Sequence, residues 1–442
     1  QSSGTQKVYG GGSATSTTIS DGGLQVVFIG GSASSTTINS GGIQGVDWGG
    51  SATGTMINNG GIQEVYGSAT GTTINSGGLQ GLHSGGSATS TTINLSGKQY
   101  VEGNATSTTI SGGGIQNVLS GGSASGTTIS GGTQNVSRGG SASGTTISGG
   151  TQNVSGGGSA SSTTINGGVT QKVYGNASTT TITGGEQYVS GGGSASGTMI
   201  NSGGFQVVFS GGSATGTTIN SGSLQDVNSG GSAIGTTINS GGIQYVSGSG
   251  SATSAAVNNG GQQIVYSGAI VTDTTVNSGG VIQIDSGAAL SGTTAINQGI
   301  INLQGASATT YAIASLVVTG GGTVTFANSA TVGNRLNITN LSGGAKFVIN
   351  TDLANGKSDQ INITSAANSQ NTVQVAYDPG FATGRNISGS ATFATVSGGS
   401  ATFTAAPTEY GAYRFTPTLS ETTGGGVDTW SVTGLTIPSD GS

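Results

Sequence analysis

Side chains that could carry out catalysis are few in this 442-residue chain, and they are widely spaced. His83 is the only histidine, there is no cysteine, and the 15 Asp and Glu residues are scattered. A Ser-His-Asp site would require His83 to meet a nucleophile and a carboxylate. An enzyme that degrades polysaccharides would need clustered carboxylates. We therefore predict a non-enzymatic protein without cofactor or metal, with a polysaccharide-degrading enzyme as the alternative.

Serine hydroxyls are the reactive groups that recur in a constant context. In the phrase "INSGG" and its variants, small residues follow the Ser and leave room around its hydroxyl for an attached group. A transferase could recognise such a short, repeated phrase in an unfolded chain. The alternative is that these hydroxyls only stabilise the turn. The candidate acceptors are Ser40, Ser76, Ser202, Ser221, Ser240 and Ser278, with Ser20, Ser111, Ser130 and Ser148 taken as equivalents in shortened bends.

Aromatic side chains recur beside the Val of the phrase "xQxV". The position after Val holds Tyr9, Phe28 and Tyr66, and Trp48 stands one place further on. If the repeats stack, these rings form a surface file that could contact sugars or a partner. The alternative is that they fold over Gly corners and cover backbone. His83 occupies the same position, which predicts a solvated corner for it.

An internal repeat predicts the elements that position these residues. The Gln of "GGxQxV" recurs in fifteen copies, nine of the fourteen steps are 19 residues long, and shorter steps lose residues at Gly-rich junctions. Segments of fixed length between Gly corners, with a period near 20, predict a solenoid. The Gln positions are Gln6, Gln25, Gln44, Gln63, Gln80, Gln99, Gln116, Gln134, Gln152, Gln171, Gln187, Gln206, Gln225, Gln244 and Gln263.

The nearly constant positions of the repeat predict which side chains point inward. They are represented by Ala14, Thr17, Ile19, Gln25 and Val27, whereas the positions between them vary. Identical residues one coil apart lie about 4.8 Å from each other, so buried Gln amides can bond in a ladder. We predict an all-β fold, a right-handed parallel β-helix with coils of about 19 residues. Gly, Thr and Ser dominate without a 3.6-residue period, which argues against helices.

The repeat fades after about residue 284. Apolar residues replace the Gln and Val, first Ile282 and Ile284 and then Ile301 and Leu303. We therefore predict a repeat β-helix over residues 1–300 and a more conventionally packed end of the same solenoid over residues 301–442.

Composition excludes several other classes. Only 5% of the residues are charged, the net charge is −6, and nine Lys and Arg residues cannot form a basic stripe, so nucleic acid is not an expected partner. No apolar run is long enough to span a bilayer as a helix. The first residues already belong to a repeat, so we expect a mature or trimmed N-terminus without a signal peptide.

The repeat phrase, as in "GSATGTTINSGG" (67–78) with "xQxV", resembles that of self-associating autotransporter adhesins of the AIDA class. The resemblance covers roughly residues 1–284. It implies a cell-surface protein, secreted across the outer membrane, that causes bacterial aggregation, biofilm formation and host-cell adhesion. The implied partners are other copies on neighbouring cells, a host-cell receptor, and a cytoplasmic heptosyltransferase that modifies serines before export.

A second segment, "LNITNLSGGAKFVINTDLANGKSDQINITSAA" (336–367), resembles the pertactin-type stem of autotransporter passengers. This resemblance implies that residues 301–442 form an autochaperone-like stem and that the chain's own outer-membrane barrel, absent here, is a further partner. Asp352, Asp359 and Asp378 then look structural.

An ice-binding solenoid is a less favoured alternative. Its flat surface would be the outward Thr file, which is interrupted by other residues. The file holds Thr18, Thr37, Thr73 and Thr92, and the interruptions are Met56, Met199 and Ala256.

Overall fold

The chain is built almost entirely from β-strands. The computed structural model describes residues 3–305, 308–326 and 331–438, and the chain divides into two compact units, residues 1–217 and 218–442. Within the described residues there is no α-helix. The helical segments there are the 3-10 turns η1 (Leu353–Asn355) and η2 (Pro379–Thr383).

Each coil of the first unit contains three short strands, which we call the Ser-Ala, Thr-Ile and Gln strands. The Ser-Ala strands are β2 (Ser13–Thr15), β5 (Ser32–Ser34), β8 (Ser51–Thr53), β11 (Ser68–Thr70), β14 (Ser87–Thr89), β17 (Asn104–Thr106), β20 (Ser123–Ser125), β22 (Ser141–Ser143), β24 (Ser159–Ser161), β27 (Asn176–Ser178), β30 (Ser194–Ser196) and β33 (Ser213–Thr215). The Thr-Ile strands are β3 (Thr18–Ile19), β6 (Thr37–Ile38), β9 (Met56–Ile57), β12 (Thr73–Ile74), β15 (Thr92–Ile93), β18 (Thr109–Ile110), β25 (Thr164–Asn166), β28 (Thr181–Thr183) and β31 (Met199–Asn201).

The Gln strands carry the "xQxV" phrase. They are β1 (Thr5–Val8), β4 (Leu24–Val27), β7 (Ile43–Val46), β10 (Ile62–Val65), β13 (Leu79–Leu82), β16 (Lys98–Val101), β19 (Ile115–Val118), β26 (Thr170–Val173), β29 (Glu186–Val189) and β32 (Phe205–Val208). In two coils the Thr-Ile and Gln strands fuse into β21 (Thr128–Val136) and β23 (Thr146–Val154).

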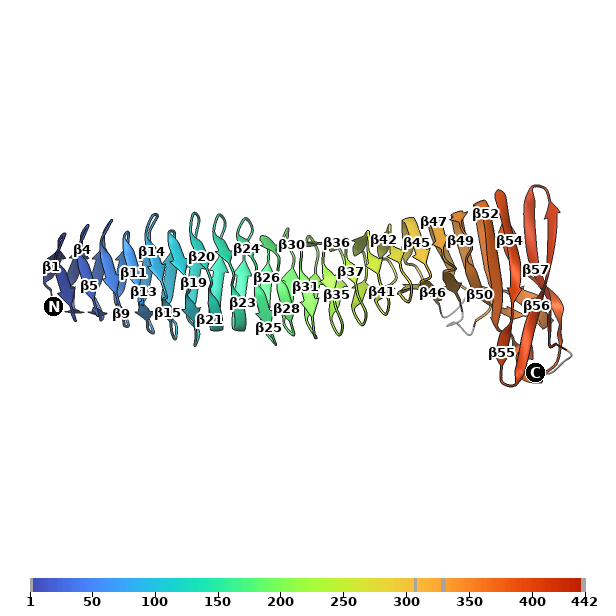
Figure 1. Ribbon diagram of the computed structural model, residues 1–442, viewed down its shortest axis with the longest axis horizontal. Coiled ribbons are helices and arrows are strands. Elements are labelled where there is room, and N and C mark those ends of the chain that lie inside the picture. The colour runs from blue at the N-terminus through green and yellow to red at the C-terminus, as the bar shows by residue number, and fades with distance from the viewer. Residues whose placement is uncertain (1–2, 306–307, 327–330, 439–442) are drawn as a thin grey trace. The chain divides into compact units, whose positions relative to one another are not determined.

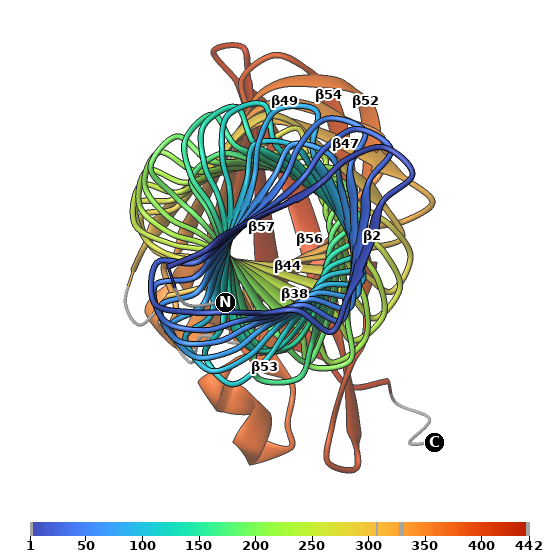
Figure 2. The ribbon, with the colours of Figure 1, turned by 90° about the vertical axis from the view of Figure 1, so that its left-hand side faces the viewer.

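Equivalent strands of neighbouring coils pair in parallel and in register. Gln44 of β7, for example, aligns with Gln25 of β4 and with Gln63 of β10. The coils of the first unit therefore follow one another in sequence order (Figure 1, blue to green), and seen end-on each is rotated slightly from the last (Figure 2). The predicted fold class, a parallel β-helix with coils of about 19 residues, is confirmed.

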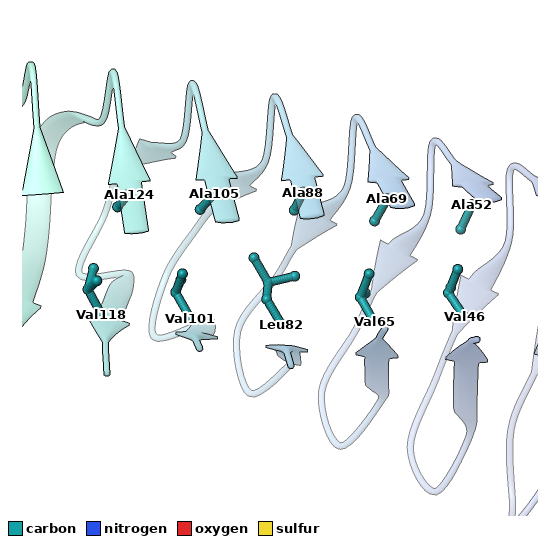
Figure 3. Packing of buried hydrophobic residues seen from close by; sticks show 10 residues of the cluster. All are labelled: Val46, Ala52, Val65, Ala69, Leu82, Ala88, Val101, Ala105, Val118 and Ala124. Atoms are coloured by element: carbon teal, nitrogen blue, oxygen red, sulfur yellow. The ribbon is translucent and has the colours of Figure 1, made fainter. Parts of the chain in front are cut away.

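The interior of the first unit consists of files of identical small side chains. Ala14, Ile19, Gln25 and Val27 are all buried, as predicted, and the equivalents of Thr17 in later coils, such as Thr36, are buried too. Figure 3 shows the Val file of the Gln strands facing the Ala file of the Ser-Ala strands, with one Leu in a Val position. These small residues fill a thin core without larger side chains.

The buried Gln side chains bond to one another from coil to coil, and Gln44 shows the complete pattern. The Gln44 amide donates to Oε1 of Gln25 (2.6 Å) and to Oγ1 of Thr36 (3.1 Å). Its own Oε1 accepts from Nε2 of Gln63 (2.7 Å) and from Oγ1 of Thr55 (3.2 Å). The predicted Gln ladder is therefore confirmed, and inward Thr hydroxyls add bonds to it in most coils, although Thr91 Oγ1 has no partner.

Glycine is required where the coils turn. Gly41 has φ +74°, and a side chain on the following Gly42 would meet the carbonyl oxygen of Ile19 in the previous coil. At the corner between the Ser-Ala and Thr-Ile strands the left-handed position is Ser35 in one coil and Gly54 in the next. Glycine at these corners therefore supplies the left-handed backbone angles and leaves room for the backbone of the neighbouring coil.

The second unit begins with the same repeat and then widens. Its Thr-Ile strands are β34 (Thr218–Ile219), β37 (Thr237–Ile238), β40 (Ala256–Val257) and β43 (Thr275–Val276), and its Ser-Ala strands are β36 (Ser232–Ile234), β39 (Ser251–Thr253) and β42 (Ile270–Thr272). The third strands are β35 (Leu224–Val227), β38 (Ile243–Val246), β41 (Gln262–Val265) and β44 (Val281–Asp285). The later strands are β45 (Ala289–Asn297), β46 (Ile300–Gln304), β47 (Thr310–Thr319), β48 (Thr323–Thr325), β49 (Arg335–Ser342), β50 (Lys346–Asp352), β51 (Lys357–Ser358), β52 (Gln360–Tyr377), β53 (Ile387–Val396), β54 (Gly399–Ala406), β55 (Thr408–Tyr410), β56 (Tyr413–Gly424) and β57 (Val427–Thr436).

An apolar file continues the register of the Gln ladder in the second unit. Ile282 aligns with Gln263, Ile301 aligns with Ile282, and Val324 then aligns with Ile301. The predicted apolar replacement is confirmed. The expectation that parallel coils run to the end of the chain is wrong, because β57 pairs antiparallel with both β53 and β56. The hairpin of β56 and β57 covers the last coil, so β53 does not present an open strand edge there.

The first prediction tests the ladder. Replacing Gln152 by Leu keeps the side-chain volume but removes the acceptor of Gln171 Nε2 (2.6 Å) and of Thr163 Oγ1 (3.2 Å). We expect the free energy of unfolding of the surrounding coils to fall by about 2–4 kcal/mol, because buried donors lose their partners. Guanidinium denaturation and hydrogen exchange of the flanking coils measure the loss.

The matched control is Asn153→Ala in the same strand. Its outward amide donates to Asn135 (2.9 Å), but the side chain is only half-buried and water can replace the bond. The cost should stay below about 1 kcal/mol. Equal losses for the two variants would contradict the ladder as the main constraint.

Candidate modification sites and contact surfaces

The serines of the "INSGG" turns are exposed. Ser40, between β6 and β7, begins the turn, and its hydroxyl lies against Gly60 of the next coil, which has no side chain to cover it. Ser221 and Ser240 lie against Gly241 and Gly260 in the same way. The six turn serines, all exposed, are Ser40, Ser76, Ser202, Ser221, Ser240 and Ser278. A group attached to any of these hydroxyls would project into solvent.

The four serines taken as equivalents stand at a different place in the coil. Ser111 donates to the side chain of Asn94 (2.9 Å), and Ser148 accepts from Asn166 (3.3 Å), so both occupy the Asn file. Ser20 also directly follows an inward Ile, whereas Ser130 aligns with Gly149 across a register shift in the fused strand β21. The placement of Ser20, Ser111 and Ser148 at the turn position is therefore wrong, whereas their role as acceptors stays a prediction. Counting from the inward Ile, and not from the Gly pair, would have separated the two sets.

In the first five coils the rings after the Gln strands form two stacked pairs instead of one file. The rings of Tyr9 and Phe28 are parallel with centroids 4.9 Å apart, and Tyr66 stacks on His83 at 4.2 Å. Asp47 separates the two pairs in sequence order.

Trp48 lies outside these stacks. It is 57% exposed, and its ring covers Gly85, where any side chain would collide with it. This contact matches the alternative in which a ring covers a Gly corner.

A small cluster of ionisable groups surrounds His83. Its Nε2 lies 2.7 Å from Glu64 Oε2, and its Nδ1 lies 3.8 Å from Glu102 Oε2. Gly81 opens a hollow of about 200 Å³ beside them. The residues that line it, all within the described chain, include no serine or cysteine that could act as a nucleophile. Sequence reasoning missed this cluster, although the 19-residue spacing of Glu64, His83 and Glu102 signals it.

The carboxylates of the second unit hold loops together. Asp359 is buried and accepts hydrogen bonds from the backbone N–H groups of Gly333 (3.0 Å), Asn334 (2.9 Å) and Asn350 (2.8 Å). Burial raises the pKa of Asp359, and these hydrogen bonds oppose the rise. Asp378 accepts from the Thr351 hydroxyl (2.7 Å). Both carboxylates have the structural role that the sequence suggested.

Within residues 3–305, 308–326 and 331–438, no group of three or more His, Cys, Asp or Glu side chains could hold a metal ion. Over the same ranges, no helix has the length and hydrophobicity needed to cross a bilayer.

Comparison with known proteins assigns the family. The family model "Adhesin of bacterial autotransporter system, probable stalk" (AIDA) matches residues 183–223, and the model "Pertactin" matches residues 313–434. A glycosylated fragment of TibA is 39% identical to this chain, over 72% of this chain and 98% of the fragment, with a TM-score of 0.44. The chain belongs to the AIDA class of autotransporter passengers.

Other comparisons are more distant. The Hap adhesin of Haemophilus influenzae is 13% identical over 98% of this chain and 59% of Hap, with a TM-score of 0.33. No curated protein sequence matches this chain. Passengers of the AIDA class are secreted and surface-exposed adhesins, so this AIDA-class passenger is an extracellular adhesin.

The second prediction tests the structural role of Asp359 in this passenger. Asp359→Asn replaces one acceptor oxygen by a donor that faces N–H groups. We expect the second unit to lose about 2–4 kcal/mol of unfolding free energy. Trp430, which is buried in this unit, reports its unfolding by fluorescence in a Trp48→Phe background.

Asp352→Asn is the control for that measurement. Asp352 accepts from Asn355 at the exposed end of β50 (2.8 Å), so the change should cost less than about 1 kcal/mol. A larger effect at position 352 than at 359 would refute the assignment.

Proposed function

We propose that this passenger acts as a self-association factor as well as an adhesin. It joins copies on neighbouring cells and attaches cells to a host-cell receptor, which leads to aggregation and biofilm formation. The observation that carries the proposal is the near absence of charge, 5% of residues, on an exterior of Ser, Thr and Asn. Such surfaces approach one another with little charge repulsion and offer many modest hydrogen bonds.

Avidity would provide the strength of this attachment. The binding free energy of a single pair of passengers is small. A cell carries many copies, however, and many linked contacts bind far more tightly than one. The purified chain should therefore associate weakly, whereas surfaces that display it densely should adhere firmly.

The proposal includes a glycan on the turn serines. A cytoplasmic heptosyltransferase would add Ser-linked heptose before export, when the chain is unfolded. Support comes from the related TibA fragment, which is described as TibC-catalyzed and hyper-glycosylated. Because Ser40 and its counterparts are exposed beside Gly, a glycan can stay attached after the coils stack.

The aromatic pairs are the candidate contact for a host glycan or protein. Tyr9 is 57% exposed and Tyr66 39%, and each lies at the end of a stacked pair. Aromatic rings bind sugar and protein surfaces with little entropy cost because they have few rotatable bonds. Trp48 is the third exposed ring in this part of the chain.

The proposed division of labour places adhesion in residues 1–300. Residues 301–442 would form the pertactin-like stem, with an autochaperone role, next to the chain's own outer-membrane barrel. The widened coils and closing hairpin of the second unit support a stable point from which coils could stack during export.

The third prediction tests the function itself. Beads coated with the purified chain at high density should clump, and they should bind host cells in a separate assay. Clumping should fall steeply as coating density falls, because avidity depends on the number of linked contacts. Beads that bind host cells but never clump would exclude self-association and leave the adhesin role.

The fourth prediction concerns the acceptors. Peptide mass spectrometry of chain co-expressed with a heptosyltransferase should find heptose at turn serines such as Ser40 and Ser76. Ser40→Ala should remove the heptose at that turn. Ser111→Ala, in the Asn file, should leave the total number of heptoses on the chain unchanged. Heptose confined to Thr residues or to the Ser-Ala strands would refute these sites.

A further inference from the structure

The ionisable side chains of the first unit are confined to one part of each coil. They lie on the Gln strands or in the turns that adjoin them, and none lies on a Ser-Ala strand, on a Thr-Ile strand or at the corner between these. The residues are Lys7, Asp21, Asp47, Glu64, His83, Lys98, Glu102, Arg138, Lys172 and Glu186. The rest of the exterior of these coils is therefore uncharged.

We call the outward side chains of the Ser-Ala and Thr-Ile strands between residues 13 and 215 the neutral face. The Ser-Ala strands present Ser, Asn and Thr residues, as Ser68 and Thr70 do in β11, where both are exposed. The Thr-Ile strands present mostly Thr, with Met56 and Met199 about half-exposed. Hydroxyls both donate and accept hydrogen bonds, so this surface can pair with a surface like itself.

We propose that the neutral face is the surface by which one copy of this chain docks on a second copy. This inference rests on the proposed function, self-association, and assigns it to one side of the first unit. Two neutral faces meet without like-charge repulsion and without the unfavourable removal of water from ions. Contact through the Gln strands would bury ions such as Lys7, Glu64 and Lys172.

The spacing of the hydroxyl files favours a second copy over an unrelated partner. Equivalent residues recur once per coil, about 4.8 Å apart. A partner matches that spacing over many coils only if it is itself a stack of β-strands, and a second copy also presents the same hydroxyl files. A two-fold axis perpendicular to the stack would pair two such faces with the coils running in opposite directions, as chains on two facing cells would be.

The upper limit of the area is close to that of a standard contact. Twelve Ser-Ala strands, at about 4.8 Å per coil, extend over roughly 58 Å. The five or so extended residues of a Ser-Ala and a Thr-Ile strand are about 16 Å wide. The neutral face thus covers at most roughly 900 Å² on each partner, and both the corner between the two strands and the rotation between coils reduce the part in contact. Standard protein interfaces bury about 800 Å² per partner.

Charge placed on the neutral face tests the proposal. In the first variant, Thr70→Glu, Thr89→Glu and Thr106→Glu put like charges on exposed positions of three consecutive Ser-Ala strands. Beads coated with this full-length variant should need more than about tenfold higher coating density to clump, because the charges repel across the contact. Beads that carry Lys at the same three positions should also need a higher coating density to clump with one another. Mixed with the Glu beads, they should clump readily, because the opposite charges attract across the contact.

The control carries the same three charges on the Gln strands. Asn117→Glu, Asn135→Glu and Asn153→Glu also occupy consecutive coils, so the repulsion within the chain is comparable. These beads should clump like the unchanged chain. Circular dichroism and thermal unfolding confirm that each variant keeps its fold.

Two results would overturn the assignment in different ways. If the unchanged beads clump and the neutral-face variants clump equally well, self-association stands and the neutral face is not its surface. If the unchanged beads never clump at any density, the proposed function itself fails.

Discussion

A buried amide is tolerated only when its donors and acceptor are all paired, and here that requirement fixes most other features of the repeat. Gln44 meets it by bonding to Gln25 and Gln63 in the coils on either side. This arrangement requires the Gln of each coil to lie directly beside the Gln of the next, so the coils must be in register. A register slip of one residue would turn the amides outward and leave their partners unpaired. The interior therefore specifies the fold by hydrogen-bond geometry, in addition to its apolar content.

The end of the ladder in the second unit shows how the constraint is released. Gln263 still donates to Gln244 (2.7 Å), and its oxygen accepts from Thr274, but the next residue in the file is Ile282. Changing to an apolar file leaves no amide unpaired, because the last oxygen already has a donor. Once the ladder has ended, larger side chains such as Phe347 can enter the core and the strands lengthen. The irregular loops that accompany wider coils need their own partners, and Asp359 supplies them.

The sequence predicts the repeat well because each coil carries the same information. Inward Ile19 and Gln25 could be recognised from their constancy, and the ladder then followed from the spacing of stacked strands. The role of the inward Thr was harder to see, since its two bonds depend on side-chain direction. Ser111 was misplaced because the Ser next to the Gly run was taken for the turn residue, whereas "ISGGGIQ" (110–116) has the full length and its Ser replaces the Asn. The antiparallel end was missed because β57 has no repeat to compare with, and its partner β53 lies far away in sequence.

An interior that is specified by hydrogen bonds leaves the exterior free to differ from one side of the coil to the other. In the first unit the turn serines follow the Thr-Ile strands, the stacked rings follow the Gln strands, and the ionisable groups remain near those same Gln strands. A sugar on Ser40 would therefore project from a different corner than the Tyr9 and Phe28 rings. Three kinds of contact can then be made by one chain without competing for the same residues. The strands of the neutral face recur in every coil, unlike the stacked rings, so this surface grows with the number of coils and the strength of a weak contact can be set by the length of the repeat.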